Sequence, residues 1–487
     1  MYLFVIDHPY HYEAENLCRV FFPFDRVVTL HDPAEAQAPQ SRTVYTAVED
    51  GVCVVRIRDE DGETARTAPQ GEEGEYSLMA LLFGALRDHT GKTPRWGMLT
   101  GIHPIKLLRQ LTERFGAAEA ERLFREKYFV SAEKAALAAR TLRSQAPVTA
   151  DVGENDYALY ISVPFCPTRC AYCSFVSQSV EKTKKQIPQY HALLLEEIRA
   201  TADCARQLGL RLRAVYVGGG TPTTFSAEQL RSMLETVRAS FDLSACTEFT
   251  VEAGRPDTID REKLTALLES GVTRISINPQ TLQDNVLENI GRRHTAQQTV
   301  EAFRLAREVG FTNINMDLIV GLPGDTYESF CDTIEQVLAL DPENVTVHAL
   351  ALKRSSRITQ SGEINRAHAD AALADRMMAY AEKRLTEHGL APYYLYRQSR
   401  MAGNLENTGW AKPGFVCAYN IFTMDETETV LACGAGGVSK LKDPYSEDLT
   451  RIFNFKYSYE YISRYGEILK RKEGIGRQYE QFRKRIR

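Results

Sequence analysis

Long hydrophobic runs are missing from this sequence. No uncharged apolar stretch approaches the roughly 18 residues that a membrane-spanning helix needs, and the mean hydropathy is -0.32. The opening run, MYLFVID, is short and has no basic lead, unlike a secretory signal. We therefore expect a cytoplasmic protein without a membrane span. Its 487 residues, 44% hydrophobic and 25% charged, suffice for a large core and two or three domains.

An excess of positive charge over a whole domain is also missing. The chain has 59 Lys and Arg against 64 Asp and Glu, whereas nucleic-acid-binding domains are usually basic, so we expect no nucleic-acid partner. The exception is residues 464–487, which carry nine Lys and Arg but only three Glu. We interpret this tail as a solvated terminal helix, with RNA or membrane contact as alternatives.

The ten cysteines do not have the pattern of a disulfide framework. Seven lie singly and are expected to be small core residues. The other three, Cys166, Cys170 and Cys173, fall within eight residues as CPTRCAYC. This C-x3-C-x2-C spacing is improbable by chance at the chain's cysteine frequency, so it indicates a chemical role.

Residues 1–145 are predicted to form a separate α+β module. Residues 42–66 alternate apolar and polar side chains around two turn signals, which predicts a hairpin. Residues 145–156 are polar, lack a period and contain Pro and Gly, so the domain boundary is expected there. The other expected elements are a strand at 2–6 and helices at 11–21, 76–89, 105–115 and 132–144.

From residue 157 onward, short β-branched runs alternate with helical patterns of 12 to 20 residues. Repeated βαβ units with right-handed crossovers produce this rhythm, so we expect an α/β fold in which residues 155–366 form a partial (β/α)6 barrel. Residues 367–487 are expected to be a long helix followed by a lid-like α/β extension. The expected barrel strands lie at 159–163, 214–217, 247–252, 274–278, 313–320 and 345–352.

The cysteine triplet follows the first of these strands, where a barrel of this kind places its chemistry. Three thiolates on a [4Fe–4S] cluster leave one iron without a protein ligand, which makes it a reaction site. Zinc would need a fourth nitrogen or sulfur ligand, and no second C-x2-C lies nearby. Zinc and plain core cysteines are the alternatives.

The position and spacing of the triplet resemble those of radical S-adenosylmethionine (SAM) enzymes. Gln280 and residues 160–166 (YISVPFC), 218–222 (GGGTP) and 317–324 (DLIVGLPG) resemble the oxygen-independent coproporphyrinogen III oxidases, in particular their HemZ branch. The similarity covers roughly residues 155–445. It implies a radical SAM fold, a [4Fe–4S] cluster, SAM and an unidentified low-potential electron donor.

The resemblance also implies which residues bind these groups. Cys166, Cys170 and Cys173 would hold the cluster, and Gly219, Gly220 and Thr221 would approach the methionine end of SAM. Glu252, Gln280, Arg292 and Asp317 would make the remaining SAM contacts. Tyr160 and Tyr172 flank the cluster and would pack on SAM or, equally, in the core. Each of the polar residues could instead be a cap or an ion-pair partner.

The reaction that the resemblance implies is the decarboxylation of two propionates of coproporphyrinogen III to vinyl groups, through a 5′-deoxyadenosyl radical. Lys353, Arg354 and Arg357 follow the sixth strand and are candidates to bind the carboxylates of this tetrapyrrole, with a solvated turn as the alternative. Two positions differ from typical members: Ser162 replaces a His, and Phe175 replaces a Cys. A heme-binding chaperone and another radical SAM reaction on a tetrapyrrole therefore stay open.

Overall fold

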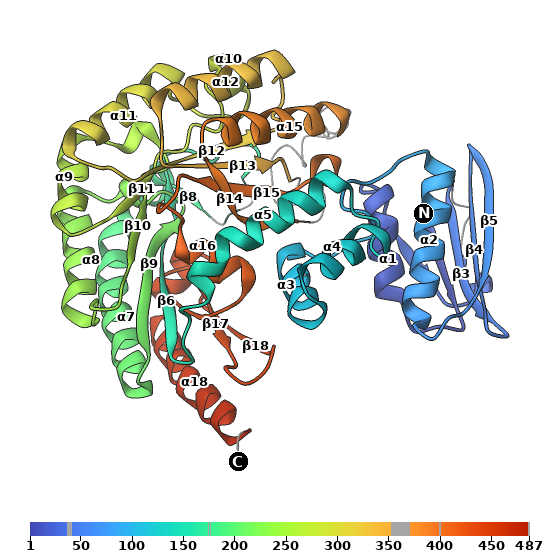
Figure 1. Ribbon diagram of the computed structural model, residues 1–487. Helices are drawn as coiled ribbons and strands as arrows, with labels where there is room; N and C mark the ends of the chain where they lie inside the picture. Colours follow the sequence, from blue (N-terminus) through green and yellow to red (C-terminus); the bar gives the residue numbers. More distant parts are fainter. Residues whose placement is uncertain (37–40, 174, 176, 352–370, 399–400, 486–487) are drawn as a thin grey trace. The chain divides into compact units, whose positions relative to one another are not determined.

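The computed structural model describes the chain except residues 37–40, 174, 176, 352–370, 399–400 and 486–487 (Figure 1). It divides into two compact units. The first contains Met1–Ala139 and Tyr396–Glu406, and the second contains Arg140–Leu395 and Asn407–Arg487. In the part of the chain that the structure describes, no helix is both long and apolar enough to cross a membrane.

The first unit contains a five-stranded sheet in the order β2-β1-β3-β4-β5. Strand β1 pairs in parallel with β2 and β3, and β3, β4 and β5 form an antiparallel meander. The predicted hairpin at 42–66 is present as β3 and β4, and the second turn signal leads into a third antiparallel strand, β5. The strands are β1 (Tyr2–Ile6), β2 (Val28–Leu30), β3 (Thr43–Glu49), β4 (Val52–Asp59) and β5 (Gly62–Pro69).

The helices α1 (His11–Phe21) and α2 (Gly74–Thr90) bury Leu17, Phe21, Leu82 and Phe83 in the core of this unit. The short helix η1 (Pro33–Glu35) follows β2, and α3 (Pro104–Phe115) and α4 (Ala117–Glu126) follow the sheet. Helix α4 was not predicted from the sequence. Its buried residues are only Ala120 and Phe124, so its apolar signal is weak.

A C-terminal segment completes the first unit. Glu406, which is fully buried, pairs with Lys134 at 2.5 Å and accepts a 2.7 Å hydrogen bond from Nε1 of Trp96. Arg397 donates to the carbonyl of Leu99 at 2.5 Å. Buried charges need such partners, so these contacts attach residues 396–406 to the N-terminal module. Nothing in the local sequence of residues 1–145 indicates this contribution.

Six consecutive parallel strands form the centre of the second unit, which confirms the predicted partial barrel. They pair in the order β6-β9-β10-β11-β12-β13. The strands are β6 (Asp156–Val163), β9 (Arg211–Gly219), β10 (Glu248–Glu252), β11 (Arg274–Ser276), β12 (Ile314–Val320) and β13 (Asn344–Ala349).

Helices surround these strands (Figure 1). Three of them, α8, α11 and α12, begin with capping boxes at Ser226, Thr295 and Thr326. The helices of this layer are α6 (Val180–Thr183), α7 (Ile187–Leu208), α8 (Ala227–Ser240), α9 (Arg261–Glu269), α10 (Asp284–Asn289), α11 (Ala296–Val309), α12 (Tyr327–Leu340) and α15 (Ala371–Glu387). Helix α5 (Ala132–Thr149) belongs to both units, because the division between them falls after Ala139.

The C-terminal residues extend the sheet on both sides to eleven strands. Strand β16 pairs in parallel with β6, and β17 and β18 follow antiparallel, while β15 pairs antiparallel with β13. These elements are β14 (Ala391–Tyr396), β15 (Asn407–Ala411), α16 (Ala418–Asp425), β16 (Thr429–Cys433), β17 (Val438–Lys442), β18 (Leu449–Phe453), α17 (Ser458–Ser463) and α18 (Tyr465–Lys484).

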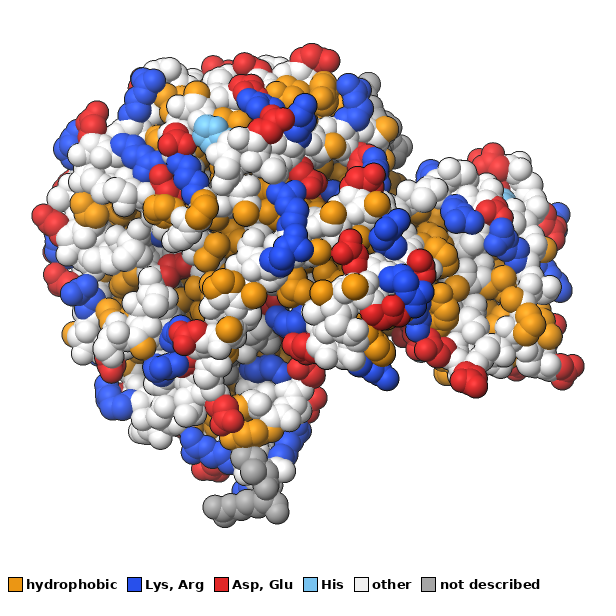
Figure 2. Space-filling view, in the orientation of Figure 1, with side chains coloured by type: hydrophobic (Ala, Val, Ile, Leu, Met, Phe, Trp, Pro, Cys, Tyr) orange, Lys and Arg blue, Asp and Glu red, His pale blue; other side chains and the backbone are white. Residues whose placement is uncertain are grey.

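The basic tail is not simply solvated. It forms α18, which buries Ile468, Ile475 and Phe482. Lys472, also buried, pairs with Glu197 of α7 at 2.9 Å. On the face drawn in Figure 2, basic and acidic side chains are interspersed.

Candidate radical SAM site

The loop that carries the cysteine triplet lies at the carboxyl end of β6. The short strands β7 (Phe165–Cys166) and β8 (Gln178–Ser179) pair and enclose it. On the other side, the amide of Ala171 donates to the carbonyl of Ile290 at 2.9 Å, and the Thr168 hydroxyl donates to the carbonyl of Gly291 at 3.3 Å. The triplet is therefore held between the first strand and the segment after α10.

The three thiols fit a cluster better than a single metal ion. Burial and the neighbouring Cys170 raise the pKa of Cys173 to about 11, and burial also raises the pKa of Cys166, so these two sulfurs are protonated unless a metal replaces the proton. Within the described ranges, no group of three His, Cys, Asp or Glu side chains could hold one metal ion. Zinc requires ligands that converge on one point. A [4Fe–4S] cluster binds each thiolate through a different iron, so its three cysteine ligands do not need to converge on one point.

Glycine is required at the end of β9 because two backbone segments approach each other closely there. Gly219 has a φ of 109°, and a Cβ there would lie 2.7 Å from Oγ of Ser162. A Cβ on Gly220 would lie 2.6 Å from the carbonyl oxygen of Phe165. Thr221 follows, and its hydroxyl donates to Sγ of Cys166 at 3.5 Å. The turn therefore packs directly on the start of the cysteine loop.

Two carboxyl groups, one at the end of β10 and one within β12, have opposite pKa shifts. Glu252, the last residue of β10, is partly buried, and the loss of solvent raises its pKa to about 7, with Asp317 adding to the shift. For Asp317 of β12, burial acts in the same direction, but hydrogen bonds from His348 and Asn315 outweigh it and lower the pKa. One carboxyl group is thus poised near neutrality and the other stays ionised.

Gln280 follows β11 in a strained backbone conformation. Its φ is 69°, in the left-handed region that residues other than glycine rarely adopt. Its amide donates to the carbonyl of Asp317 at 2.9 Å, and its own carbonyl accepts from Ile319 at 3.0 Å. Such strain persists where surrounding structure enforces it, often at binding sites.

Arg292 is buried beside the cysteine loop. It donates to the carbonyl of Asn278 at 2.6 Å and to the hydroxyl of Tyr172 at 3.2 Å. Its Nε has no hydrogen-bond partner among the described residues. A buried guanidinium with a spare donor suits a carboxylate ligand. Tyr172 itself packs against the apolar cluster of α10, which includes Leu287 and Ile290.

Tyr160 belongs to a stack of three tyrosines. Its ring lies 6.3 Å from that of Tyr216 and 6.0 Å from that of Tyr419, and the last two rings are 4.4 Å apart. Tyr216 also donates to Oε1 of Glu252 at 2.7 Å. Tyr216 and Tyr419 were not predicted as site residues. Tyr216 lies two residues before the glycines at 218–220, and Tyr419 comes from α16 and has no local signal.

The two unusual positions have different surroundings. Ser162 is buried and donates to the carbonyl of Ala435 at 2.7 Å, while its own carbonyl accepts from the Tyr190 hydroxyl at 2.8 Å. Phe175 is 68% exposed. The candidate substrate residues Lys353, Arg354 and Arg357 lie outside the described residues, so they stay sequence predictions.

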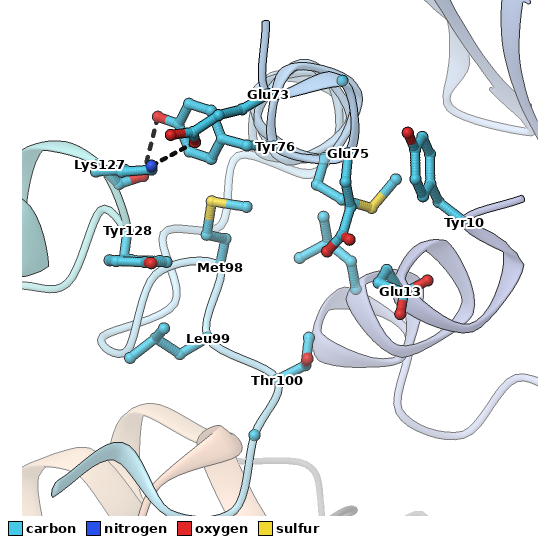
Figure 3. Close-up of a pocket in the computed structure, with 14 residues that line it drawn as sticks. Tyr10, Glu13, Glu73, Glu75, Tyr76, Met98, Leu99, Thr100, Lys127 and Tyr128 are labelled. Carbon is cyan, nitrogen blue, oxygen red and sulfur yellow. Dashed lines mark hydrogen bonds and ion pairs between the residues drawn. The ribbon is translucent and has the colours of Figure 1, made fainter. Parts of the chain in front are cut away.

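The first unit has a pocket of its own, of about 620 Å³ (Figure 3). Lys127 lies over the ring of Tyr76 at 4.8 Å and pairs with Glu73. Among the described residues, Glu13 and Glu75 have no ion-pair partner, which leaves the pocket acidic. No spacing in the sequence predicts this pocket, because four separate segments of the chain line it.

Comparison with known proteins agrees with the site. A family model for the radical SAM superfamily matches residues 160–337. The oxygen-independent coproporphyrinogen-III oxidase-like protein HemZ of Bacillus subtilis is 38% identical over 80% of this chain and 78% of that protein. The heme chaperone HemW of Haemophilus influenzae is 30% identical over 68% of this chain and 82% of that protein.

A solved structure, the coproporphyrinogen III oxidase HemN of Escherichia coli, has the same fold. The superposition of the two structures covers 67% of this chain and 72% of the HemN chain, with a TM-score of 0.52 and 23% sequence identity. Members of the superfamily use a [4Fe–4S] cluster and SAM, and the three free thiols, one buried and two partly buried, fit these groups together with the spare donor of Arg292. The chain therefore belongs to the radical SAM family of HemZ-like proteins, and its cofactors are a [4Fe–4S] cluster and SAM.

Proposed function

We propose that this protein converts two propionate side chains of coproporphyrinogen III to vinyl groups and so yields protoporphyrinogen IX. The observation that carries this proposal is the similarity to the HemZ protein, which extends over 80% of the chain and into residues outside the barrel. Two further observations support it: Arg292 donates to the hydroxyl of Tyr172 in the cysteine loop, and the amide of Gln280 donates to the carbonyl of Asp317, whose charge raises the pKa of Glu252. Each conversion releases carbon dioxide, one hydrogen atom and one electron.

In this proposal Cys166, Cys170 and Cys173 would hold the cluster, and SAM would bind beside it. When reduced by a low-potential donor, these groups supply a 5′-deoxyadenosyl radical that takes the hydrogen atom from the propionate β-carbon. The protein's part is to bind and orient. Arg292, with its spare Nε, would hold the SAM carboxylate.

The remaining SAM contacts follow from the chemistry of the strand ends. Glu252 and Asp317 present carboxylates that accept hydrogen bonds from ribose hydroxyls, and Gln280 presents an amide to a polar edge. Thr221 and the two preceding glycines would lie beside the methionine end, next to Cys166. The stack of Tyr160, Tyr216 and Tyr419 would form an apolar wall of the site.

Lys353, Arg354 and Arg357 are proposed to bind the carboxylates of the tetrapyrrole, on the evidence of the sequence alone. Reversing their charges should raise KM for coproporphyrinogen III. SAM cleavage without substrate should not change, because these cations would contact propionates and not SAM. An unchanged KM in the triple variant would remove these residues from the substrate site.

A heme chaperone is the second candidate. Two observations favour it: the similarity to the HemW protein, which covers 82% of that protein, and the replacements at Ser162 and Phe175. A chaperone would hold the cluster and bind heme without acting on coproporphyrinogen III.

One experiment separates the two candidates. The cluster-loaded protein is incubated without oxygen with dithionite and SAM, and with either coproporphyrinogen III or heme. The oxidase proposal expects protoporphyrinogen IX as product. Absence of product from a fully loaded protein, together with stoichiometric binding of heme, would replace the oxidase with the chaperone.

A further inference from the structure

Arg255 is a buried cation that points at the cysteine loop. It lies three residues after Glu252, just beyond the end of β10, and its relative exposure is 4%. Its Nη1 donates to the Thr168 hydroxyl at 3.2 Å and lies 3.7 Å from Sγ of Cys170, in hydrogen-bond geometry. The side chain therefore contacts two residues of the cysteine loop, the hydroxyl of Thr168 and the thiol of Cys170.

The rest of the guanidinium is fixed by a carboxylate. Nε and Nη2 each donate to one oxygen of Asp257 at 2.9 Å, a bidentate arrangement. Asp257 also lies 3.7 Å from Nδ1 of His294, in the segment that carries Arg292. Because two nitrogens bind Asp257, the third is aimed at Cys170, and the carboxylate lies on the side away from the sulfur.

We propose that Arg255, held by Asp257, is a positioning residue that stabilises the negative charge of the cluster at Cys170 and so raises its reduction potential. The inference rests on the proposed binding of the cluster by Cys166, Cys170 and Cys173. A hydrogen bond to a ligating sulfur favours the more negative, reduced state of a cluster. The effect is strong at a site with little solvent, where charges are weakly screened.

Arg292 also lies near Cys170, but the two arginines have different roles. Arg292 donates to Asn278 and Tyr172 and keeps Nε for a ligand. All three nitrogens of Arg255 are engaged with Asp257, Thr168 and Cys170. Arg255 is thus built to act on the loop and not on a substrate.

The test is a redox titration of the loaded protein, followed by electron paramagnetic resonance, for the wild type and for Arg255→Gln, Arg255→Lys and Asp257→Asn. Arg255→Gln should lower the reduced-to-oxidised ratio at a fixed potential about tenfold, which is 59 mV for one electron. Arg255→Lys and Asp257→Asn should shift it in the same direction by less. Arg293→Ala, at an exposed neighbour of Arg292, is the control and should not shift it.

Iron and sulfide content decides how each result is interpreted. Variants that hold a full cluster at the wild-type reduction potential overturn the inference. If Arg255→Gln loses its cluster, the potentials of Asp257→Asn and Arg255→Lys are compared with the wild type instead, and unchanged values again overturn it. A cluster that survives replacement of all three cysteines overturns the proposed site instead, whatever the arginine variants do.

Discussion

Tyr216 donates a 2.7 Å hydrogen bond from its hydroxyl to Oε1 of Glu252, across the neighbouring strands β9 and β10. This bond lowers the pKa of Glu252, while burial and Asp317 raise it, and the balance is about 7. The charge on Glu252 at neutral pH therefore depends on Tyr216. Because a carboxylate accepts hydrogen bonds better than a carboxylic acid, ligand binding at Glu252 should respond to pH.

Tyr216→Phe should weaken SAM binding at pH 7 and move its pH dependence upward. In the wild type, affinity should rise severalfold between pH 6 and 8 as Glu252 ionises. Without the hydroxyl the pKa of Glu252 rises, so the same increase in SAM affinity should occur at higher pH. Each pKa unit corresponds to roughly 1.4 kcal/mol of free energy. Equilibrium binding of SAM to the loaded protein between pH 6 and 9 measures this. Tyr45→Phe, which removes an exposed bond to Glu49, is the matched control, and equal curves for both variants would contradict the prediction.

The cysteine triplet was the most informative part of the sequence, because its spacing is local. The alternation of strand and helix patterns is also local, and it predicted six parallel strands in the right order. What escaped prediction depends on contacts between distant segments. Arg255 reaches Cys170 across 85 residues, and Tyr419 joins Tyr160 across more than 250. Gly219 was expected to let backbone approach SAM, and in the structure its lack of a Cβ also accommodates Ser162.

Replacing Cys166, Cys170 or Cys173 by Ala should abolish the cluster, because three thiolates are needed to bind three of its irons. Iron, sulfide and absorption measurements on protein purified without oxygen would report the loss. Cys204→Ala, at a partly exposed cysteine in α7, should keep full cluster content. Retention of the cluster in the triple variant would show that it binds elsewhere.

Lys472→Met should destabilise the second unit. Its ammonium lies 2.9 Å from Oε1 of Glu197, and both side chains are buried. Removing one partner leaves a buried charge uncompensated, at a cost of about 3–5 kcal/mol. Urea unfolding should show a lower midpoint, whereas Lys470→Met, at an exposed position of the same helix, should change it little. Equal midpoints would mean that α18 is not anchored by this pair.

Glu428→Gln should make stability less dependent on pH. Both carboxyl oxygens of Glu428 are buried without a hydrogen-bond partner among the described residues, and burial raises its pKa to about 8. The folded state then holds a proton that the unfolded state loses above about pH 4.5, so this contribution to stability is lost as pH rises toward 8. The variant should gain stability over the wild type between pH 5.5 and 8 in urea unfolding. A constant difference between the two proteins would contradict the buried, protonated state.

The most direct test of the account is the number of SAM molecules cleaved for each macrocycle converted. The cluster-loaded protein is incubated without oxygen with dithionite, SAM and coproporphyrinogen III. We expect two molecules of 5′-deoxyadenosine and two of carbon dioxide for each protoporphyrinogen IX formed, one of each per propionate. Cleavage of SAM that is independent of coproporphyrinogen III, with no carbon dioxide released, would contradict it.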